Sequence, residues 1–431
     1  ANSSCGALVG SACMKLFSNH LLNEIREQFD YVDSDPVDGE RIFLDSASGS
    51  LRLRAATDAL AEHSRWPDQV GRLGAGSRLV ADAIQRGTED VRLLLGAQSG
   101  VIMPAMSSTH AAFRAVNAVV SSHPGGSVVT TSIEHPGVYD ATCQLAKTHG
   151  QEWRVAPVNP DTGFISVESI LDRVDPETRL IAVMHGANLT GAVHDITSIA
   201  REARLISNDV FALSDGVQYA PHAPVDVAAL GVDSYLFSPY KAFCVKGIGF
   251  GWLSDRMASL PHWSLAGKPA DDWSLGCPEN GTFAAWSATA DYLAWLGSHF
   301  TSSSDRREQF VAAMRASHFH LEGLLHRLVE GLRKMDHVQL IGVGDDLANR
   351  VCLLLFNVNG LPAAQVSEFL HRHGLRVPHR VFDSCEKYAL ASLEVRDALR
   401  ISACHYNSPH EIDTFLELIG QLAPTLRDTS L

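Results

Sequence analysis

The sequence lacks the features that mark membrane proteins, nucleic-acid-binding proteins and disulfide-stabilised proteins. Its apolar runs are all too short to span a bilayer. Lys and Arg number 35 against 49 Asp and Glu, and the resulting net charge of -14 opposes a basic nucleic-acid-binding face. The eight cysteines form no Cys-x-x-Cys pair and no zinc-ligand spacing, so we expect no metal site and a reduced, cytoplasmic protein.

The composition suits a large folded enzyme. With 45% hydrophobic and 19% charged residues, a chain of 431 residues can bury the core of two lobes. Internal repeats and low-complexity tracts are absent. The opening residues lack the basic start of a secretory signal, and Met14 resembles a native start, so residues 1–13 are a candidate tag remnant.

Short apolar runs alternate with helical stretches over the first two thirds of the chain. This alternation predicts an α/β fold with a mainly parallel sheet and crossover helices. Ligands of such sheets bind beyond the carboxyl ends of the strands. The predicted strands are Gly100–Met103, Val128–Thr131, Arg179–Met184, Val210–Leu213, Tyr235–Phe237 and Gly249–Leu253.

The pattern changes near residue 285. A long amphipathic stretch at 306–335 is followed by apolar runs at 338–342, 350–358 and 398–405. A last helix starts at Ser408-Pro409-His410-Glu411, with a capping residue, a proline at its first position and a glutamate at its third. We predict an N-terminal segment at 1–39 that belongs with a small lobe, a large cofactor-binding domain at 40–284 and a small α+β domain at 285–431.

Two residues that follow strand candidates suit an aromatic cofactor anchored at both ends. Asp215 follows the strand Val210–Leu213, and Lys241 follows Tyr235–Phe237, 26 positions later. A lysine amine forms a Schiff base with an aldehyde, and a carboxylate keeps a nearby pyridine nitrogen protonated, as pyridoxal phosphate requires. Taken alone, each residue is more commonly an exposed polar group at a strand end.

The longer match around this pair resembles the class V aminotransferases, and more narrowly the cysteine desulfurase-like branch of fold type I pyridoxal phosphate enzymes. Between Asp215 and Gly249 the chain has the family's aspartate, glutamine, His-x-Pro-x-Asp and serine with lysine. Further family motifs follow one another over about residues 40–420, which makes chance a poor explanation. They lie at 43–48, 134–135, 185–191, 400–402 and 406–413.

The resemblance implies a role for each matching residue. Lys241 is the implied Schiff base, Asp215 the pyridinium partner and His135 the ring that stacks on the cofactor. Arg400 is implied to bind the substrate α-carboxylate, with Ala47 and Asn188 beside it. The other implied cofactor contacts are Asn188 and Gln218 at the phenolic oxygen, and Ser108, Thr109, Ser238, Tyr240 and Thr282 at the phosphate.

Two of these positions need separate comment, because one differs from the usual family residue and the other implies a second protomer. Tyr240 stands where the family commonly has histidine, and a phenol can donate to phosphate but cannot carry a positive charge. Thr282 follows Gly281 in a pair that resembles the one by which a neighbouring protomer contributes to the phosphate site. The resemblance therefore implies a homodimer with shared active sites, with no nucleic-acid or membrane partner. For Ser108 and Thr109, ordinary helix capping would use the same residue types.

Cys385 bears on which reaction is catalysed. It precedes Arg400 by 15 positions, a spacing that resembles desulfurases in which a cysteine carries sulfur away as a persulfide. However, the family's usual His-His-Cys-Ala-x-Pro is replaced by residues 382–387, in which two acids flank the thiol and disfavour a thiolate. We therefore favour an inert Cys385 and a lyase that breaks a bond at the β carbon, such as carbon–sulfur cleavage of cysteine, cystine or a conjugate.

Other reactions of the same family stay open at the level of sequence. They include a desulfurase that uses Cys385, an aminotransferase, an epimerase and a β-decarboxylating enzyme that forms a carbon–carbon bond. A catalytically silent scaffold would have no need of the whole set of Lys241, Asp215, His135 and Arg400. A nicotinamide-dependent oxidoreductase is disfavoured because Gly247-Ile248-Gly249 leads into a strand instead of a helix.

Overall fold

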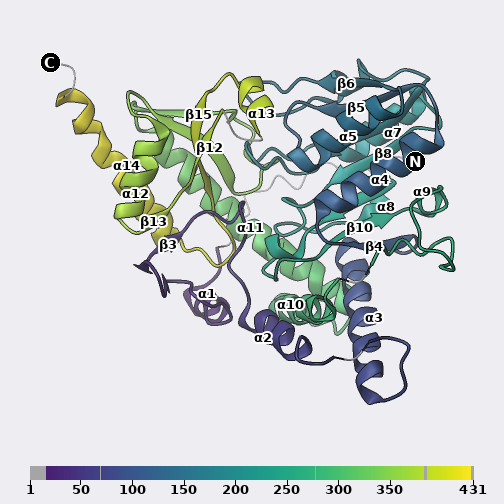
Figure 1. Cartoon of the computed structure of the whole chain (residues 1–431). Helices are drawn as coiled ribbons and strands as arrows, with labels where there is room; N and C mark the ends of the chain where they lie inside the picture. Colours follow the sequence, from purple (N-terminus) through teal and green to yellow (C-terminus); the bar gives the residue numbers. More distant parts are fainter. Residues whose placement is uncertain (1–15, 68, 277, 383–385, 429–431) are drawn as a thin grey trace.

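The computed structural model describes residues 16–67, 69–276, 278–382 and 386–428. Figure 1 shows a large sheet flanked by helices, a smaller sheet beside it and a set of long helices that runs beneath and between the two. In the described ranges, no helix is both long enough and apolar enough to cross a bilayer.

The larger sheet has seven described strands in the order β4-β10-β9-β8-β7-β5-β6. Pairing is parallel from β9 through β8, β7 and β5 to β6, while β10 runs antiparallel to both β4 and β9. The predicted α/β class with a mainly parallel sheet is thus confirmed. The strands are β4 (Val101–Ala105), β5 (Ser127–Thr131), β6 (Glu152–Ala156), β7 (Thr178–Met184), β8 (Phe211–Asp215), β9 (Ser234–Phe237) and β10 (Gly249–Leu253).

All six predicted strands form, and β6 is the one in this sheet that sequence reasoning missed. β6 lies at the sheet edge, and its charged Glu152 and Arg154 give no continuous apolar run. The described helices and 3₁₀ turn of this lobe are α4 (Ser108–Ser122), α5 (Pro136–Thr148), α6 (Val167–Leu171), α7 (Ile196–Ile206), α8 (Val227–Leu230), η1 (Pro239–Lys241) and α9 (Asp255–Ala258).

Helix α4 lies against the middle of the large sheet and directs its first turn toward the strand ends. Its small side chains Ala111, Ala112 and Ala115 are fully buried, which lets the helix approach the strands closely. The N-cap Ser107 accepts a hydrogen bond from the His110 amide at 3.1 Å, so the helix starts at a fixed point beside β10.

A group of long helices supports both sheets. Helix α10 packs against α2, α3 and α11, and α11 also packs against α14 of the small lobe. The predicted division at 284/285 falls within α10, which continues through it, and the three-part division stays a prediction. The bounds are α1 (Asn19–Arg26), α2 (Arg54–His63), α3 (Ala75–Leu95), α10 (Asn280–Ser298) and α11 (Arg306–Arg333).

The smaller sheet is antiparallel, with its described strands in the order β11-β12-β15-β14. A short parallel pair, β3 with β13, ties the N-terminal segment to this side of the molecule, and β1 pairs with β2 within that segment. The strands are β1 (Ser34–Asp35), β2 (Gly39–Glu40), β3 (Ile42–Phe43), β11 (Val338–Ile341), β12 (Leu353–Val358), β13 (Leu375–Arg376), β14 (His379–Val381) and β15 (Asp397–Ser402).

The last helix starts as its sequence predicts. The Ser408 amide donates to Glu411 Oε2 at 2.7 Å, and the Glu411 amide donates to Ser408 Oγ at 3.2 Å, which is a reciprocal capping box. This cap fixes the chain just after β15, the strand that carries Arg400. The helices of this lobe are α12 (Ala363–Arg372), α13 (Lys387–Ser392) and α14 (Pro409–Asp428).

Candidate functional site

A cleft at the carboxyl ends of β7, β8 and β9 gathers most of the predicted cofactor residues. Asp215 is the last residue of β8, and Lys241 ends the turn η1 that follows β9. Ser107, Met184, Gly186 and Val217 also line the cleft and were not predicted. The predicted residues that line it are Ser108, Thr109, His135, Asn188, Asp215, Gln218, Ser238, Tyr240 and Lys241.

Lys241 is buried in this cleft, and its amine donates to the carbonyl oxygen of Ala47. Gln218 Nε2 donates to the same oxygen at 2.7 Å, so Ala47 contributes a backbone group to the site. Burial, and then the nearby positive charge of Arg400, lower the pKa of Lys241 to about 7. A large fraction of the amine is therefore neutral near pH 7, and the neutral form is the nucleophile that attacks a carbonyl.

Asp215 lies beneath the cleft, with Oδ1 accepting the Val217 amide at 3.0 Å. Burial raises the pKa of its carboxyl group, and nearby His135 opposes that rise. The residue after it must be glycine, because a Cβ on Gly216 would lie 2.0 Å from the ring of Tyr235. The Tyr235 hydroxyl is in turn 2.9 Å from His185 Nδ1. The Tyr235 ring therefore packs against the backbone at Gly216, next to Asp215, and is itself held by His185.

His135 caps the start of α5, and its Nδ1 accepts the Gly137 amide at 3.1 Å. That contact leaves the proton of the neutral ring on Nε2, and burial lowers the pKa of the imidazole, which keeps it neutral. A Cβ on Gly137 would lie 2.6 Å from Thr109 Oγ1, so the first turns of α4 and α5 are in close contact. The imidazole thus lies beside the start of α4.

The first turn of α4 offers an anion site. The hydroxyl groups of Ser108, Thr109 and Ser238 make no hydrogen bond to the residues that the structure describes, and all three line the cleft. A Cβ on Gly249 would lie 2.3 Å from the Ser108 amide nitrogen, so only glycine lets β10 pass this close. Free amides and hydroxyls at a helix start bind phosphate well.

Tyr240, at the position where the family commonly has histidine, also faces the cleft. Burial raises the pKa of its phenol, so the group stays neutral and can donate a hydrogen bond to a phosphate oxygen. Its ring packs 3.4 Å from the position that a Cβ on Gly49 would take.

Arg400 lies behind Asn188, fully inside the protein with 2% of its surface exposed. Its guanidinium donates to the Asn188 carbonyl at 2.9 Å and to Ser48 Oγ at 2.6 Å, and it pairs with Asp45 at 3.4 Å. Burial lowers the pKa of Arg400 to about 10, so it is still a cation near pH 7. Its Nε atom is buried without a hydrogen-bond partner in the described residues.

Sequence reasoning missed the residues that surround Asn188 and Arg400. Asn188 Nδ2 donates to Glu386 Oε1 at 2.7 Å, while Asn188 Oδ1 is buried and has no partner in the described chain. The motif at 43–48 contained the signal for Asp45 and Ser48, but it was read only for the substrate contact at Ala47. The sequence marked Glu386 only as an acidic residue beside Cys385. Only the fold shows that its side chain contacts Asn188.

One predicted cofactor residue, Thr282, does not line this cleft in the single described chain. Thr282 lies in the first turn of α10, where its hydroxyl donates to the Glu279 carbonyl at 2.6 Å. It is only 3% exposed in the single chain, so its contribution to a neighbouring protomer stays a prediction. Cys385 lies outside the described residues.

The donor set of the cleft fits pyridoxal phosphate. The cleft is lined by unused hydroxyl groups at the start of α4, by the buried carboxyl group of Asp215 and by Lys241. The orphaned Oδ1 of Asn188 adds one more buried polar atom without a protein partner. These are the groups that an aldehyde with a phosphate and a pyridine nitrogen requires.

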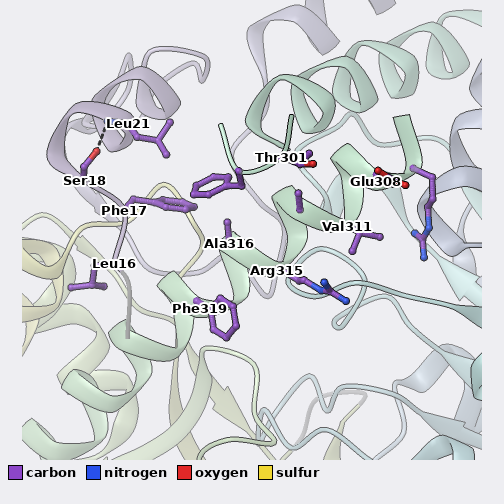
Figure 2. A pocket seen from close by; sticks show the side chains of 13 residues that line it. Leu16, Phe17, Ser18, Leu21, Thr301, Glu308, Val311, Arg315, Ala316 and Phe319 are labelled. Atoms are coloured by element: carbon purple, nitrogen blue, oxygen red, sulfur yellow. Dashed lines mark hydrogen bonds between the residues drawn. The ribbon is translucent and has the colours of Figure 1, made fainter. Parts of the chain in front are cut away.

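A second, larger cavity lies elsewhere, between the N-terminal segment and α11 (Figure 2). Phe17, Leu21, Val311 and Phe319 make its surface mainly apolar, and Arg315 and Glu308 lie along one side in this view. Its described lining residues include no lysine, histidine or cysteine, so we assign the chemistry to the Lys241 cleft.

We expect Asp215→Asn to fold and to bind the cofactor, because Lys241 and the phosphate contacts are unchanged. Turnover should fall by roughly 100-fold to 1000-fold, since an amide cannot hold a proton on the pyridine nitrogen. Steady-state kinetics and cofactor absorbance measure the two effects separately. Asp226→Asn, at an exposed helix cap, is the matched control. Normal turnover in Asp215→Asn would reduce Asp215 to a turn residue.

Comparisons with known proteins agree with this site. The family model described as Aminotransferase class-V matches residues 42–415. A cysteine desulfurase from Cronobacter sakazakii is 27% identical over 416 residues, covering 91% of this chain and 96% of the relative. One from Yersinia pestis is 26% identical over 423 residues, with 92% and 96% covered.

Solved structures show the same fold. The apo cysteine desulfurase of Thermococcus onnurineus superposes with a TM-score of 0.77 at 21% identity, covering 93% of this chain and 97% of that one. A cysteine desulfurase of Escherichia coli gives a TM-score of 0.76 at 20% identity, with 95% and 100% covered. The arrangement of lobes around the cleft is therefore that of fold type I.

Proposed function

The chain belongs to the class V aminotransferase family as a cysteine desulfurase-like, pyridoxal phosphate-dependent enzyme, and we propose that it cleaves the carbon–sulfur bond of a cysteine-type L-amino acid. One observation carries this proposal: the Arg400 guanidinium is held behind the Lys241 cleft and contacts Asn188, which lines it. A cation there suits an α-carboxylate. The relatives named cysteine desulfurases favour sulfur on the β carbon.

Each residue has a distinct task in the proposed reaction. When bound, pyridoxal phosphate supplies an electron-accepting ring that stabilises negative charge at the substrate α carbon. Lys241 removes and returns the proton at that carbon, a task for which a pKa of about 7 is well suited. With the cofactor bound, Asp215 would hold the proton on the pyridine nitrogen, and the neutral His135 ring would lie against the cofactor and exclude water.

Arg400 orients the substrate. A guanidinium that offers two parallel hydrogen bonds fixes the carboxylate plane, and this aligns the bond to be broken with the cofactor ring. Asp45 and Ser48 keep the guanidinium in place before substrate binds. The unpaired Nε is one of the donors that these contacts leave available for a carboxylate oxygen.

The segment that follows Cys385 favours direct cleavage over sulfur transfer. Tyr388 stacks on Tyr139 with ring centroids 3.6 Å apart, and its hydroxyl donates to the Glu134 carbonyl at 2.6 Å. Glu386 is tied to Asn188 at 2.7 Å. A cysteine that carries sulfur out of the site must move with it, and these contacts anchor its C-terminal neighbours to the cofactor lobe.

We further propose that the enzyme acts as a homodimer in which Thr282 completes the neighbouring phosphate site. The support is the Gly281-Thr282 pair at the start of α10. Because Thr282 is 3% exposed in the single chain, this arrangement requires the first turn of α10 to be uncovered when the two subunits meet.

Product analysis tests the proposed reaction. Direct cleavage turns cysteine and water into pyruvate, ammonia and sulfide, whereas transfer to a thiol gives alanine and a persulfide. The purified enzyme should be incubated with cysteine, cystine and S-substituted cysteines, and pyruvate, alanine and sulfide should be measured. Keto acid without sulfur release, or carbon dioxide, would contradict carbon–sulfur cleavage and favour transamination or decarboxylation.

We expect Cys385→Ser to keep most of its carbon–sulfur cleavage activity, within about threefold of wild type. The reason is that Lys241 and Arg400, and not the thiol, carry the proposed reaction. Pyruvate and sulfide release measure the effect, with Cys143→Ser on α5 as the matched control. A Cys385→Ser enzyme that binds cysteine with an intact cofactor spectrum but releases no sulfur would make this protein a desulfurase.

A further inference from the structure

Glu134 is a fully buried acid that the proposed reaction does not use. It lies between β5 and α5, directly before His135, and 1% of its surface is exposed. Its Oε1 atom accepts a hydrogen bond from Thr131 Oγ1 at 2.7 Å and one from the Met184 amide at 2.9 Å. Glu134 therefore links the ends of β5 and β7 at the edge of the sheet where the cleft lies.

The second oxygen of this carboxyl group has no partner. Oε2 is buried and makes no hydrogen bond to the residues that the structure describes. Burial raises the pKa of Glu134 to about 8, and Asp215 adds to the rise, while the hydrogen bonds from Met184 and Thr131 oppose it. Because an ionised Glu134 would leave an unpaired negative charge inside the protein, the geometry favours a protonated side chain near pH 7.

Asp215 is the neighbouring acid, and its surroundings differ from those of Glu134. It pairs in register with Met184 across β8 and β7, and Met184 is the residue whose amide Glu134 binds. His135 and Lys241 oppose the rise in the pKa of Asp215, whereas neither does so for Glu134. When two acids interact and only one has such neighbours, the other keeps its proton. Glu134 is therefore the acid that stays neutral.

The other titratable neighbours of Glu134 supply no cation. Tyr388, on α13, donates to the Glu134 carbonyl at 2.6 Å, and burial raises the pKa of its phenol. His194 Nδ1 is 2.9 Å from the Met184 carbonyl oxygen, and burial lowers the pKa of this histidine to about 4. Burial also lowers the pKa of His135, the next residue in the chain. None of these described neighbours offers Glu134 a positive charge near pH 7.

We propose that Glu134 is a positioning residue that works in its protonated form: it fixes the segment that leads into His135 and leaves the negative charge at the cleft to Asp215. Its contacts with Thr131 and Met184 hold that segment against the sheet. The inference concerns the cofactor end of the cleft. It therefore goes beyond the proposed carbon–sulfur cleavage and holds for whichever bond the enzyme breaks.

The buried proton makes stability depend on pH in a defined direction. The folded protein holds the proton of Glu134 up to about pH 8, whereas the ordinary pKa of such a group is 4.5. Between these values the unfolded state binds fewer protons, so Glu134 lowers stability as pH rises. The amide of Glu134→Gln does not titrate. From pH 5 to pH 8 the folding equilibrium constant of this variant should gain roughly 100-fold or more on wild type.

Infrared difference spectroscopy of the cofactor-loaded enzyme observes the proton directly. The spectrum of wild type minus Glu134→Gln should show the carbonyl band of an un-ionised carboxyl group at pH 6.5 and carboxylate bands at pH 9.5. Glu330→Gln, on the exposed face of α11, is the matched control and should show carboxylate bands at both pH values. Carboxylate bands from Glu134 at pH 6.5 would overturn the proposal.

Turnover tests the positioning role. Glu134→Ala removes the acceptor for Thr131 and Met184 and should lower kcat by roughly tenfold or more, with a changed cofactor absorbance. Glu134→Gln keeps that acceptor, so kcat at pH 6.5 should return to within about threefold of wild type. The fall in kcat that we expect for wild type as pH rises through about 8 should be absent from Glu134→Gln. This variant decides the question if Glu134→Ala does not fold.

The outcomes separate this inference from the proposed function. If Glu134→Gln and wild type share one pH profile in kcat and in thermal midpoint, the protonated role of Glu134 is wrong. If folded, cofactor-loaded Glu134→Gln loses more than about tenfold in kcat at pH 6.5, the proton does more than position and the proposal is also wrong. Carbon–sulfur cleavage fails separately, by product analysis, and the infrared and stability results then still decide the role of Glu134.

Discussion

Replacing Lys241 with alanine should abolish turnover, by at least about 1000-fold, and prevent covalent attachment of the cofactor. The buried amine is the only lysine among the residues that line the described cleft, and burial holds its pKa near the value at which it can both attack and transfer protons. The variant should still take up pyridoxal phosphate non-covalently, because the start of α4 and Asp215 are unchanged. Binding is followed by absorbance, and turnover by product release.

Peptide mapping provides the control for this prediction. Borohydride reduction of the wild-type enzyme should fix the cofactor to the peptide that contains Lys241. Lys246 is the matched control because its amine also lies near the site, 5.6 Å from the Tyr240 ring, but it is exposed. A label on Lys246, or full activity in Lys241→Ala, would overturn the assignment of Lys241.

Arg400→Ala should be nearly as damaging, with kcat/KM for α-amino acids lowered by about 1000-fold. Part of the loss is in binding, because the carboxylate has no partner, and part is in kcat, because the reacting bond is no longer aligned. The substitution also leaves Asp45 without its buried cation and the Asn188 carbonyl without a donor. A lower thermal midpoint should therefore accompany the loss of activity.

Two comparisons isolate the carboxylate effect. Arg400→Lys keeps the charge but not the two parallel donors, so its activity should lie between wild type and Arg400→Ala. Cysteamine, which lacks the carboxylate, should bind wild type and Arg400→Ala with similar affinity when the change in cofactor absorbance is titrated. Unchanged kcat/KM for cysteine in Arg400→Ala would mean that the substrate presents no α-carboxylate to this residue.

The sequence predicted the secondary structure best where local signals agree. The strands β7, β8 and β9 are fully buried or nearly so, and their apolar runs are visible without any partner. The start of α14 follows from four consecutive residues. By contrast, β6 escaped prediction because its strand character comes from pairing with β5 and not from its own composition.

Sequence motifs were sufficient to predict most of the residues that line the cleft proposed to hold the cofactor. Nine of the ten predicted cofactor residues line one cleft, and they lie in short segments just after strands. Because parallel strands deliver their carboxyl ends to one edge of a sheet, strand order alone brings such segments together. Thr282 did not follow this rule, since its expected partner is a second chain.

What the sequence by itself determined is the family and the cofactor, and it predicted the lysine, aspartate and histidine that we propose serve this cofactor, because each is carried by a local motif at a strand or helix end. Only the tertiary structure showed which residues hold Arg400 and Asn188 in place. Asp45 and Arg400 are 355 positions apart, and Asn188 and Glu386 are 198 apart, so no local pattern links them. Their meeting depends on the packing of the small lobe against the large sheet, and hydrogen bonds between distant residues leave no periodic signal in a single sequence.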